Sequence, residues 1–358
     1  MKRLTIGLLA ALAASAAFAE DVPAPKPLDA KIDRVLRSSL TRCKEMTLSQ
    51  QESPMNLPAS FSSILVKVES PRAACETQTL VVTSRLGGIY VGVPWIIRDV
   101  EGKTIEEKLK NFAWQSLHMN FTPEVDRSAL TADGLFRVTM VQTTEFGKMP
   151  MQGEVDPEGN VFFMGHFQRL VDDTNAARLK TLEPFISAAP QEGSAKPSVT
   201  VIEFSDFECP SCQHASGYMN PIMSKYSDQV RYIRYDLPLV SMHPWALSAA
   251  VAGRAIYKQK PALFWDYKKE VYENQEKLSS FTIDDFARSF AKDHELDLAK
   301  YDADVNSADL RADVLKAAGA ALTNDVRSTP TYMVNGVFID AGENGKGLEE
   351  YVASLLKK

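Results

Sequence analysis

The sequence has few of the residue patterns that hold metals or bind nucleic acids. Its four cysteines and five histidines include one CxxC pair, with no second pair and no nearby HxxxH to complete a tetrahedral zinc site. No basic block accompanies the net charge of −6, which argues against nucleic acid as a partner. After the first 19 residues, no stretch approaches the roughly 18 apolar residues that a membrane span requires. We therefore expect no metal, no other cofactor and no nucleic-acid partner.

The first 19 residues have the pattern of an export signal. Lys2 and Arg3 precede an apolar run rich in Ala and Leu, and residues 17–19 (Ala-Phe-Ala) have the small-x-small form of a cleavage site. The alternative is a retained membrane anchor, but the apolar run is short for a span and no lipid-attachment cysteine follows it. We expect cleavage between Ala19 and Glu20 and export to the periplasm, an oxidising compartment in which disulfides persist.

The rest of the chain is long enough for two domains. Residues 20–187 alternate between strand patterns and amphipathic helical patterns, which predicts an α+β domain with mostly antiparallel strands. Residues 188–197 are rich in Pro and Gly and are predicted to be a linker. Residues 198–358 form the second domain, in which helical patterns span about 243–324. The first domain has no phosphate loop or nucleophile elbow, so its sequence assigns it no chemistry.

The chemistry is carried by Cys209-Pro210-Ser211-Cys212, at the end of a predicted strand. An apolar run that starts at Val201 predicts a buried strand, and the residues after the Pro can continue as a helix. Free backbone N–H groups and the helix dipole favour an anion at a helix start. Cys209 occupies that start and Cys212 lies one turn inside. We therefore predict that the Cys209 thiolate attacks or leaves in thiol–disulfide exchange.

A carboxylic acid, Glu203, lies within the apolar strand six residues before Cys209. A carboxylate is costly to bury there unless it has a role. A half-buried carboxyl under the dithiol can take the proton that Cys212 must lose when it attacks a mixed disulfide. The alternative is an edge residue that faces water. We favour the role in proton transfer.

These residues, together with residues 328–336 (Ser-Thr-Pro-Thr-Tyr-Met-Val-Asn-Gly), resemble the DsbA-like branch of the thioredoxin superfamily. The resemblance covers a little under half of the chain. It implies an α/β thioredoxin fold with a helical insertion, preceded by the separate α+β domain. It also implies a cis Pro330 facing the sulfurs, and a Thr329 backbone that pairs with the substrate peptide. We assign Pro210, Ser211, Thr329 and Pro330 to substrate binding on this basis.

Two residues depart from the DsbA pattern. Ser211 stands where DsbA has a His that helps to hold the thiolate, so we expect a milder oxidant. Thr329 stands where DsbA has Val and is similar to DsbC and DsbG, which leaves isomerase or reductase activity open. The leading prediction is an exported dithiol oxidase that acts on thiols of exported proteins and is reoxidised by a membrane partner of the DsbB or quinone-linked type.

Two alternatives remain. If the N-terminal domain makes the chain a homodimer, two facing active sites suit an isomerase kept reduced by a DsbD-like protein. The predicted hairpin over residues 153–167 resembles the dimerisation domain of DsbC and DsbG, which motivates this alternative. The other alternative is a redox-inert holdase in which the thioredoxin fold only grips extended peptide. A bare binding groove has no need for a dithiol at a helix start, so we place it last.

The remaining cysteines and two histidines are interpreted as structural or solvated. Cys43 and Cys75 are separated by 31 residues, and a disulfide closing that loop could stabilise the domain by a few kcal/mol. The alternative is a second redox pair that relays electrons to the CxxC. His214 follows the dithiol on the predicted helix and is interpreted as solvated. His243 is interpreted as a structural residue at the entry to the helical insertion.

Overall fold

The computed structural model describes residues 28–39, 45–53, 55–71, 76–144, 147–168, 174–324, 326 and 328–357. The predicted signal peptide and the proposed Cys43–Cys75 disulfide lie outside the described residues, so both stay predictions. Within the described ranges, no helix is long and apolar enough to cross a membrane.

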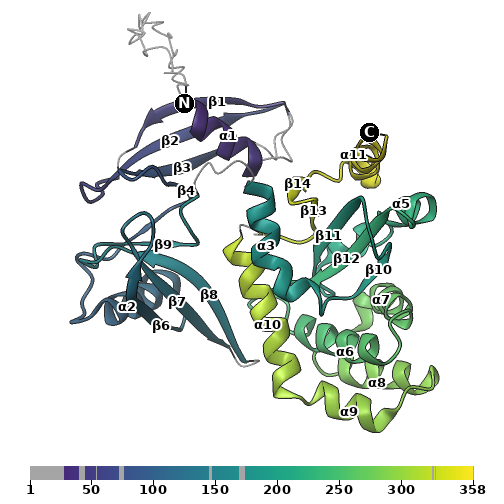
Figure 1. Ribbon diagram of the computed structural model, residues 1–358. Coiled ribbons are helices and arrows are strands. Elements are labelled where there is room, and N and C mark those ends of the chain that lie inside the picture. The colour runs from purple at the N-terminus through teal and green to yellow at the C-terminus, as the bar shows by residue number, and fades with distance from the viewer. Residues whose placement is uncertain are drawn as a thin grey trace, which may run out of the picture.

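The N-terminal region contains two antiparallel sheets (Figure 1). Helix α1 precedes a sheet of order β1-β2-β3-β4, and helix α2 precedes the strands of a sheet of order β5-β9-β8-β7-β6. An isolated antiparallel bridge between Ile89 and Gln168 joins the two halves. The predicted antiparallel α+β domain is confirmed. Its elements are α1(Ala30–Ser39), β1(Thr47–Glu52), β2(Phe61–Glu69), β3(Thr77–Ser84), β4(Ile89–Val91), β5(Trp95–Ile96), α2(Ile105–Leu117), β6(Phe121–Leu130), β7(Phe136–Thr144), β8(Gly147–Val155) and β9(Val161–Met164).

The C-terminal region has a thioredoxin fold with a helical insertion, as predicted. Strands β11 and β12 are parallel neighbours at the centre of a sheet of order β10-β12-β11-β13-β14, whose other pairs are antiparallel. The inserted helices lie between β12 and β13. The elements are α3(Thr174–Ile186), β10(Gln191–Gly193), β11(Val199–Ser205), α4(Pro210–Ala215), α5(Asn220–Tyr226), β12(Val230–Asp236), α6(Ala246–Gln259), α7(Leu263–Glu273), η2(Gln275–Lys277), α8(Ile283–Asp293), α9(Leu298–Val305), α10(Ala308–Thr323), β13(Thr331–Val334), β14(Val337–Ile339), η3(Glu343–Gly345) and α11(Lys346–Leu356).

The prediction of a linker at residues 188–197 is wrong. This segment contributes strand β10, which pairs with β12 at the edge of the thioredoxin sheet. Gly193 has φ 90°, and a Cβ added there would lie 2.2 Å from the carbonyl oxygen of Val230. Glycine is therefore required by the close approach of two backbones and does not mark a flexible connection. The C-terminal domain begins before residue 198.

Helix α10 joins the two regions. In Figure 1 it lies between β8 of the N-terminal region and the thioredoxin sheet. A Cβ added at Gly319 would lie 2.0 Å from the carbonyl oxygen of Pro150, so the helix and β8 are in direct backbone contact. The Thr323 hydroxyl also accepts a hydrogen bond from the Gln152 N–H at 3.2 Å. One apolar core consequently runs from β8 through α10 into the helical insertion.

Candidate active site

The two cysteines lie where strand β11 passes into helix α4. Cys209 is the residue before the first turn of the helix, with an extended backbone (φ −72°, ψ 119°), and Pro210 occupies the first helical position. Proline suits the first helical position because the backbone N–H that it lacks would have no hydrogen-bond partner within the helix. The backbone N–H groups of Cys212 and Gln213 donate to the Cys209 carbonyl at 3.0 and 3.1 Å. Both thiols are free, and Cys209 is 7% exposed while Cys212 is fully buried.

The two thiols differ strongly in acidity. The pKa of Cys209 is lowered to about 5, chiefly because the Cys212 thiol can donate a hydrogen bond to its sulfur. Burial opposes this, whereas Thr329 and the backbone N–H groups of Ser211 and Cys212 lower the pKa further. Burial and the neighbouring Cys209 raise the pKa of Cys212 well above its usual range. The arrangement thus favours one negative charge, on Cys209.

The loop before strand β13 lies across from Cys209. The Cys209 sulfur is 3.6 Å from the carbonyl oxygen of Thr329, and the Thr329–Pro330 peptide bond is cis. The structure therefore brings together the two segments that the resemblance pairs, although they are 120 residues apart. Pro210 and Ser211 are exposed on the outside of the helix start. Their role in substrate binding, like that of Thr329 and Pro330, stays a prediction.

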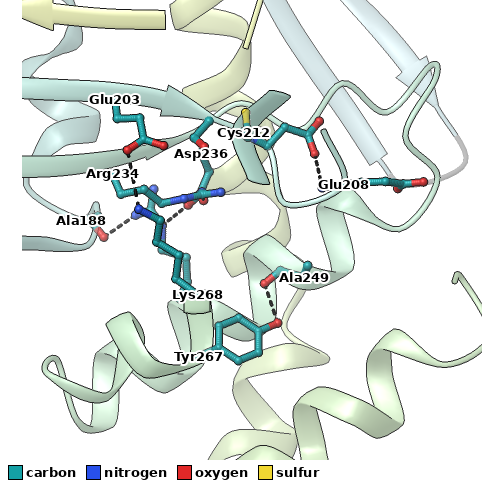
Figure 2. A network of polar contacts seen from close by, with 12 residues as sticks. Ala188, Glu203, Glu208, Cys212, Arg234, Asp236, Ala249, Tyr267 and Lys268 are labelled. Carbon is teal, nitrogen blue, oxygen red and sulfur yellow. Dashed lines mark hydrogen bonds and ion pairs between the residues drawn. The ribbon is translucent and has the colours of Figure 1, made fainter. Parts of the chain in front are cut away.

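Glu203 is buried more deeply than predicted. It lies on the central strand β11 with 1% exposure, so the interpretation as an edge residue facing water is wrong. Tyr232 donates a hydrogen bond to its carboxylate. The Lys268 amine lies 3.7 Å from the same oxygen, and Figure 2 shows Lys268 beside Glu203. Among the described residues, these contacts place the carboxylate with Tyr232 and Lys268 and not with either sulfur. Its role in proton transfer stays a prediction.

A pocket of about 600 Å³ reaches the partners of Glu203. It lies against α4 and α7, and its lining includes Gln213, Tyr232, Trp265, Lys268 and Tyr272. Burial lowers the pKa of Lys268, although the charge of Glu203 opposes that shift. The pocket gives solvent a path toward a charged pair that is otherwise enclosed.

Two acidic residues just before Cys209 were missed as parts of the site. The Asp206 carboxylate accepts hydrogen bonds from the N–H groups of Glu208 and Leu239, at 2.7 and 2.8 Å. The Glu208 carboxylate accepts from the N–H groups of Trp245 and Ala246, at 2.7 and 3.1 Å, and so satisfies the start of helix α6. The sequence offers one indication of their role, because Asp206 and Glu208 flank Phe207 at the end of an apolar run. Apart from the Glu208 N–H, their partners lie more than 30 residues downstream, so no local sequence pattern indicates them.

Buried charged and polar side chains also contact the loop that carries Cys209. Arg234 pairs with Asp236, and its guanidinium lies 3.9 Å from the ring centre of Phe207, two residues before Cys209. Figure 2 shows Arg234 and Asp236 beside the Glu203–Lys268 pair. From the helical insertion, the Gln275 amide donates to the carbonyls of Phe207 and Cys209, at 2.8 and 3.2 Å. The loop that carries Cys209 is therefore fixed by side chains of both the sheet and the insertion.

Comparison with known proteins identifies relatives of the C-terminal part of the chain. A family model described as Thioredoxin matches residues 188–354. A probable disulfide bond formation protein D of Bacillus cereus is 30% identical over 142 residues, covering 38% of this chain and 66% of that protein. The C-terminal part of the chain is a domain of the thioredoxin superfamily. The matched range includes strand β10, in agreement with the corrected domain start.

This thioredoxin domain is also similar to parts of longer proteins and to solved structures. Na(+)/H(+) antiporter NhaA 1 of Mycolicibacterium vanbaalenii is 30% identical over 139 residues, covering 39% of this chain and 22% of the antiporter. The chain thus spans less than two thirds of the length of either relative. Similar structures are BdbD of Bacillus subtilis (22% identity, TM-score 0.43, covering 48% of this chain and 95% of that one) and the catalytic domain of Proteus mirabilis ScsC (18%, 0.42, 51% and 98%).

Proposed function

We propose that the protein is an exported thiol–disulfide oxidoreductase that acts mainly as a dithiol oxidase on other exported proteins. The observation that supports this proposal is the difference in acidity within the CxxC pair. Cys209 has a pKa of about 5, whereas the pKa of its partner is raised. A sulfur that ionises easily leaves easily, so a disulfide containing it is readily passed to a substrate.

The reaction would proceed through a mixed disulfide at Cys209. A substrate thiolate attacks the Cys209 sulfur of the oxidised pair, the bond to Cys212 breaks, and Cys212 departs with the electron pair and takes a proton. A second substrate thiolate then attacks the substrate's own sulfur, and Cys209 leaves as a thiolate. The substrate has lost two electrons and gained a disulfide, and the CxxC pair is reduced. A membrane partner of the DsbB or quinone-linked type would reoxidise it.

The neighbouring residues have separable roles in this proposal. The Thr329 carbonyl oxygen lies 3.6 Å from the Cys209 sulfur, where the Thr329 backbone can pair with the substrate peptide beside Pro330. Pro210 and Ser211 form the exposed rim that the peptide meets first. The Cys212 sulfur is fully buried, so its proton must pass through the protein interior. Glu203, with a solvent path through the pocket at Lys268, is the candidate that holds this proton.

The proposal is tested by following the oxidation of a reduced peptide that contains two cysteines. We expect Cys209→Ser to lose this activity and Cys212→Ser to accumulate a mixed disulfide through Cys209, visible by mass spectrometry. Unchanged oxidation by Cys209→Ser would contradict the assignment. Protection of an unfolded substrate that survives loss of both cysteines would instead support the holdase.

Disulfide isomerisation is the second candidate, and the Thr329 side chain beside Cys209 favours it through its similarity to DsbC and DsbG. An isomerase of that kind needs two facing active sites, so the chain should then be a dimer in light scattering. A monomer would argue against the isomerase. The reduction potential of the Cys209–Cys212 couple against glutathione also separates the two, since a value near that of thioredoxin favours the isomerase or reductase.

A further inference from the structure

The segment over residues 206–212, which carries both cysteines, has two carboxylates and no basic side chain. The two residues between the cysteines, Pro210 and Ser211, carry no charge. Two carboxylates, Asp206 and Glu208, lie within three residues of Cys209 on the same loop. Negative charges near a thiolate disfavour it, and a cation in contact with these carboxylates would offset their effect.

His243 is a basic residue in contact with one of these carboxylates. It follows strand β12 at the entry to the helical insertion, and its Nδ1 lies 2.7 Å from the Asp206 carboxylate. Its side chain is 16% exposed, so the pair is only partly screened by solvent. The backbone N–H of Asp206 in turn lies 3.5 Å from the Cys212 sulfur, as a donor to it. The imidazole is thus held by a residue that itself contacts the dithiol.

A second contact fixes the same two segments together. The Glu208 carboxylate, adjacent to Cys209 in the chain, accepts the N–H groups of Trp245 and Ala246. The segment over residues 243–246 is therefore fastened to the segment over residues 206–208 at two points. Movement of the imidazole away from the Cys209 loop would break one of these contacts.

The electrostatics agree with this geometry. The pKa of His243 is raised, first by its hydrogen bond to Asp206 and further by the charges of Asp206, Cys209 and Glu208, while burial opposes the shift. These three are the titratable groups that act most strongly on the imidazole. Because the attraction between two charges is mutual, an imidazolium that is favoured by the Cys209 thiolate also favours that thiolate.

We propose that His243 is a positioning residue that supplies, from the entry of the helical insertion, the positive charge beside Cys209 that the Pro210-Ser211 dipeptide lacks. This inference rests on the proposed function and deepens it. It also extends the interpretation of His243 as purely structural. The thiolate and the imidazolium coexist from about pH 5, where Cys209 ionises, up to the raised pKa of His243.

The test is the rate of alkylation of Cys209 by iodoacetamide in the reduced full chain, followed by mass spectrometry as a function of pH. We expect His243→Gln to move the midpoint of the Cys209 profile upward by about half a unit to one unit, which slows alkylation at pH near 5 several-fold. His243→Lys keeps a cation and should restore most of the shift. His214→Gln removes an exposed imidazole from α4 itself and should leave the midpoint unchanged.

The outcomes separate this inference from the proposed function. A low midpoint in the unaltered protein with no change in folded His243→Gln overturns the role of His243 alone. A shift in His243→Gln that His243→Lys does not reverse also overturns it, because the effect would then come from lost structure and not from lost charge. Circular dichroism establishes whether each variant is folded. An ordinary midpoint in the unaltered protein overturns the proposed function itself.

Discussion

The acidity of Cys209 predicts a particular pH dependence of stability in the reduced protein. Its folded pKa of about 5 lies below its ordinary value of 9.0, so folding favours the thiolate. The stabilisation is fully present above about pH 9, and it is lost as the pH falls through about 5, where the folded protein also binds the proton. Four units at about 1.36 kcal/mol each give a largest contribution of about 5 kcal/mol. Between these limits the slope is about 1.4 kcal/mol per pH unit.

The assay compares the reduced protein with Cys209→Ser by urea unfolding under a strong reductant. Serine cannot ionise in this range, so the variant changes the free energy of unfolding by an amount that does not depend on the Cys209 proton. The difference between the two proteins should shrink by about 2 to 3 kcal/mol as the pH is lowered from about 7.5 to 5.5. A difference that stays constant with pH would refute the acidity assigned to Cys209.

Three other substitutions test the surroundings of the site. Gly319→Ala should destabilise the protein by about 1–3 kcal/mol in urea unfolding, because its Cβ would meet the Pro150 carbonyl at 2.0 Å. Glu203→Gln should cost about 3–5 kcal/mol because it leaves the Lys268 cation buried without its anion, and adding Lys268→Met should recover most of the loss. Thr329→Val should raise the pKa of Cys209 in a thiol titration, because Thr329 contributes to lowering it.

Each of these has its own control. Lys316 lies on the exposed side of the same helix as Gly319, so Lys316→Ala should change the free energy of unfolding little. An equal loss of stability in Lys316→Ala and Gly319→Ala would point to the helix itself and not to its contact with β8. Failure of Lys268→Met to rescue Glu203→Gln would show that the carboxylate acts through something other than that pair. A Thr329→Val profile that coincides with the parent would remove Thr329 from the electrostatics of Cys209.

The fold of the C-terminal domain could be predicted because its signals are local. The apolar run of β11 and the Pro after Cys209 mark a strand–helix junction, and Asn335-Gly336 marks the turn between β13 and β14. Strand β1 (Thr47–Glu52) was missed because its sequence, TLSQQE, has almost no apolar residues and forms an exposed edge. Strand β6 was missed because Pro123 and several charged residues interrupt its alternation.

The candidate site could be predicted only in part, for a similar reason. Cys209, Cys212 and Glu203 are close in the chain, and their relation follows from one strand and one turn of helix. Asp206 contacts His243 and Glu208 contacts Trp245, and both of these residues lie at the start of the helical insertion, more than 30 residues later in the chain. No sequence period links the two segments, so only the packed structure shows that His243 faces the dithiol loop.

A pH titration of the thiolate ultraviolet absorbance in the reduced protein, with Cys209→Ser as the blank, tests whether the fold holds Cys209 as an anion. We predict one thiolate that appears with a midpoint near pH 5 and is absent in the Cys209→Ser blank. A midpoint near 9, the ordinary value for a cysteine, would contradict the claim that the fold holds Cys209 as an anion.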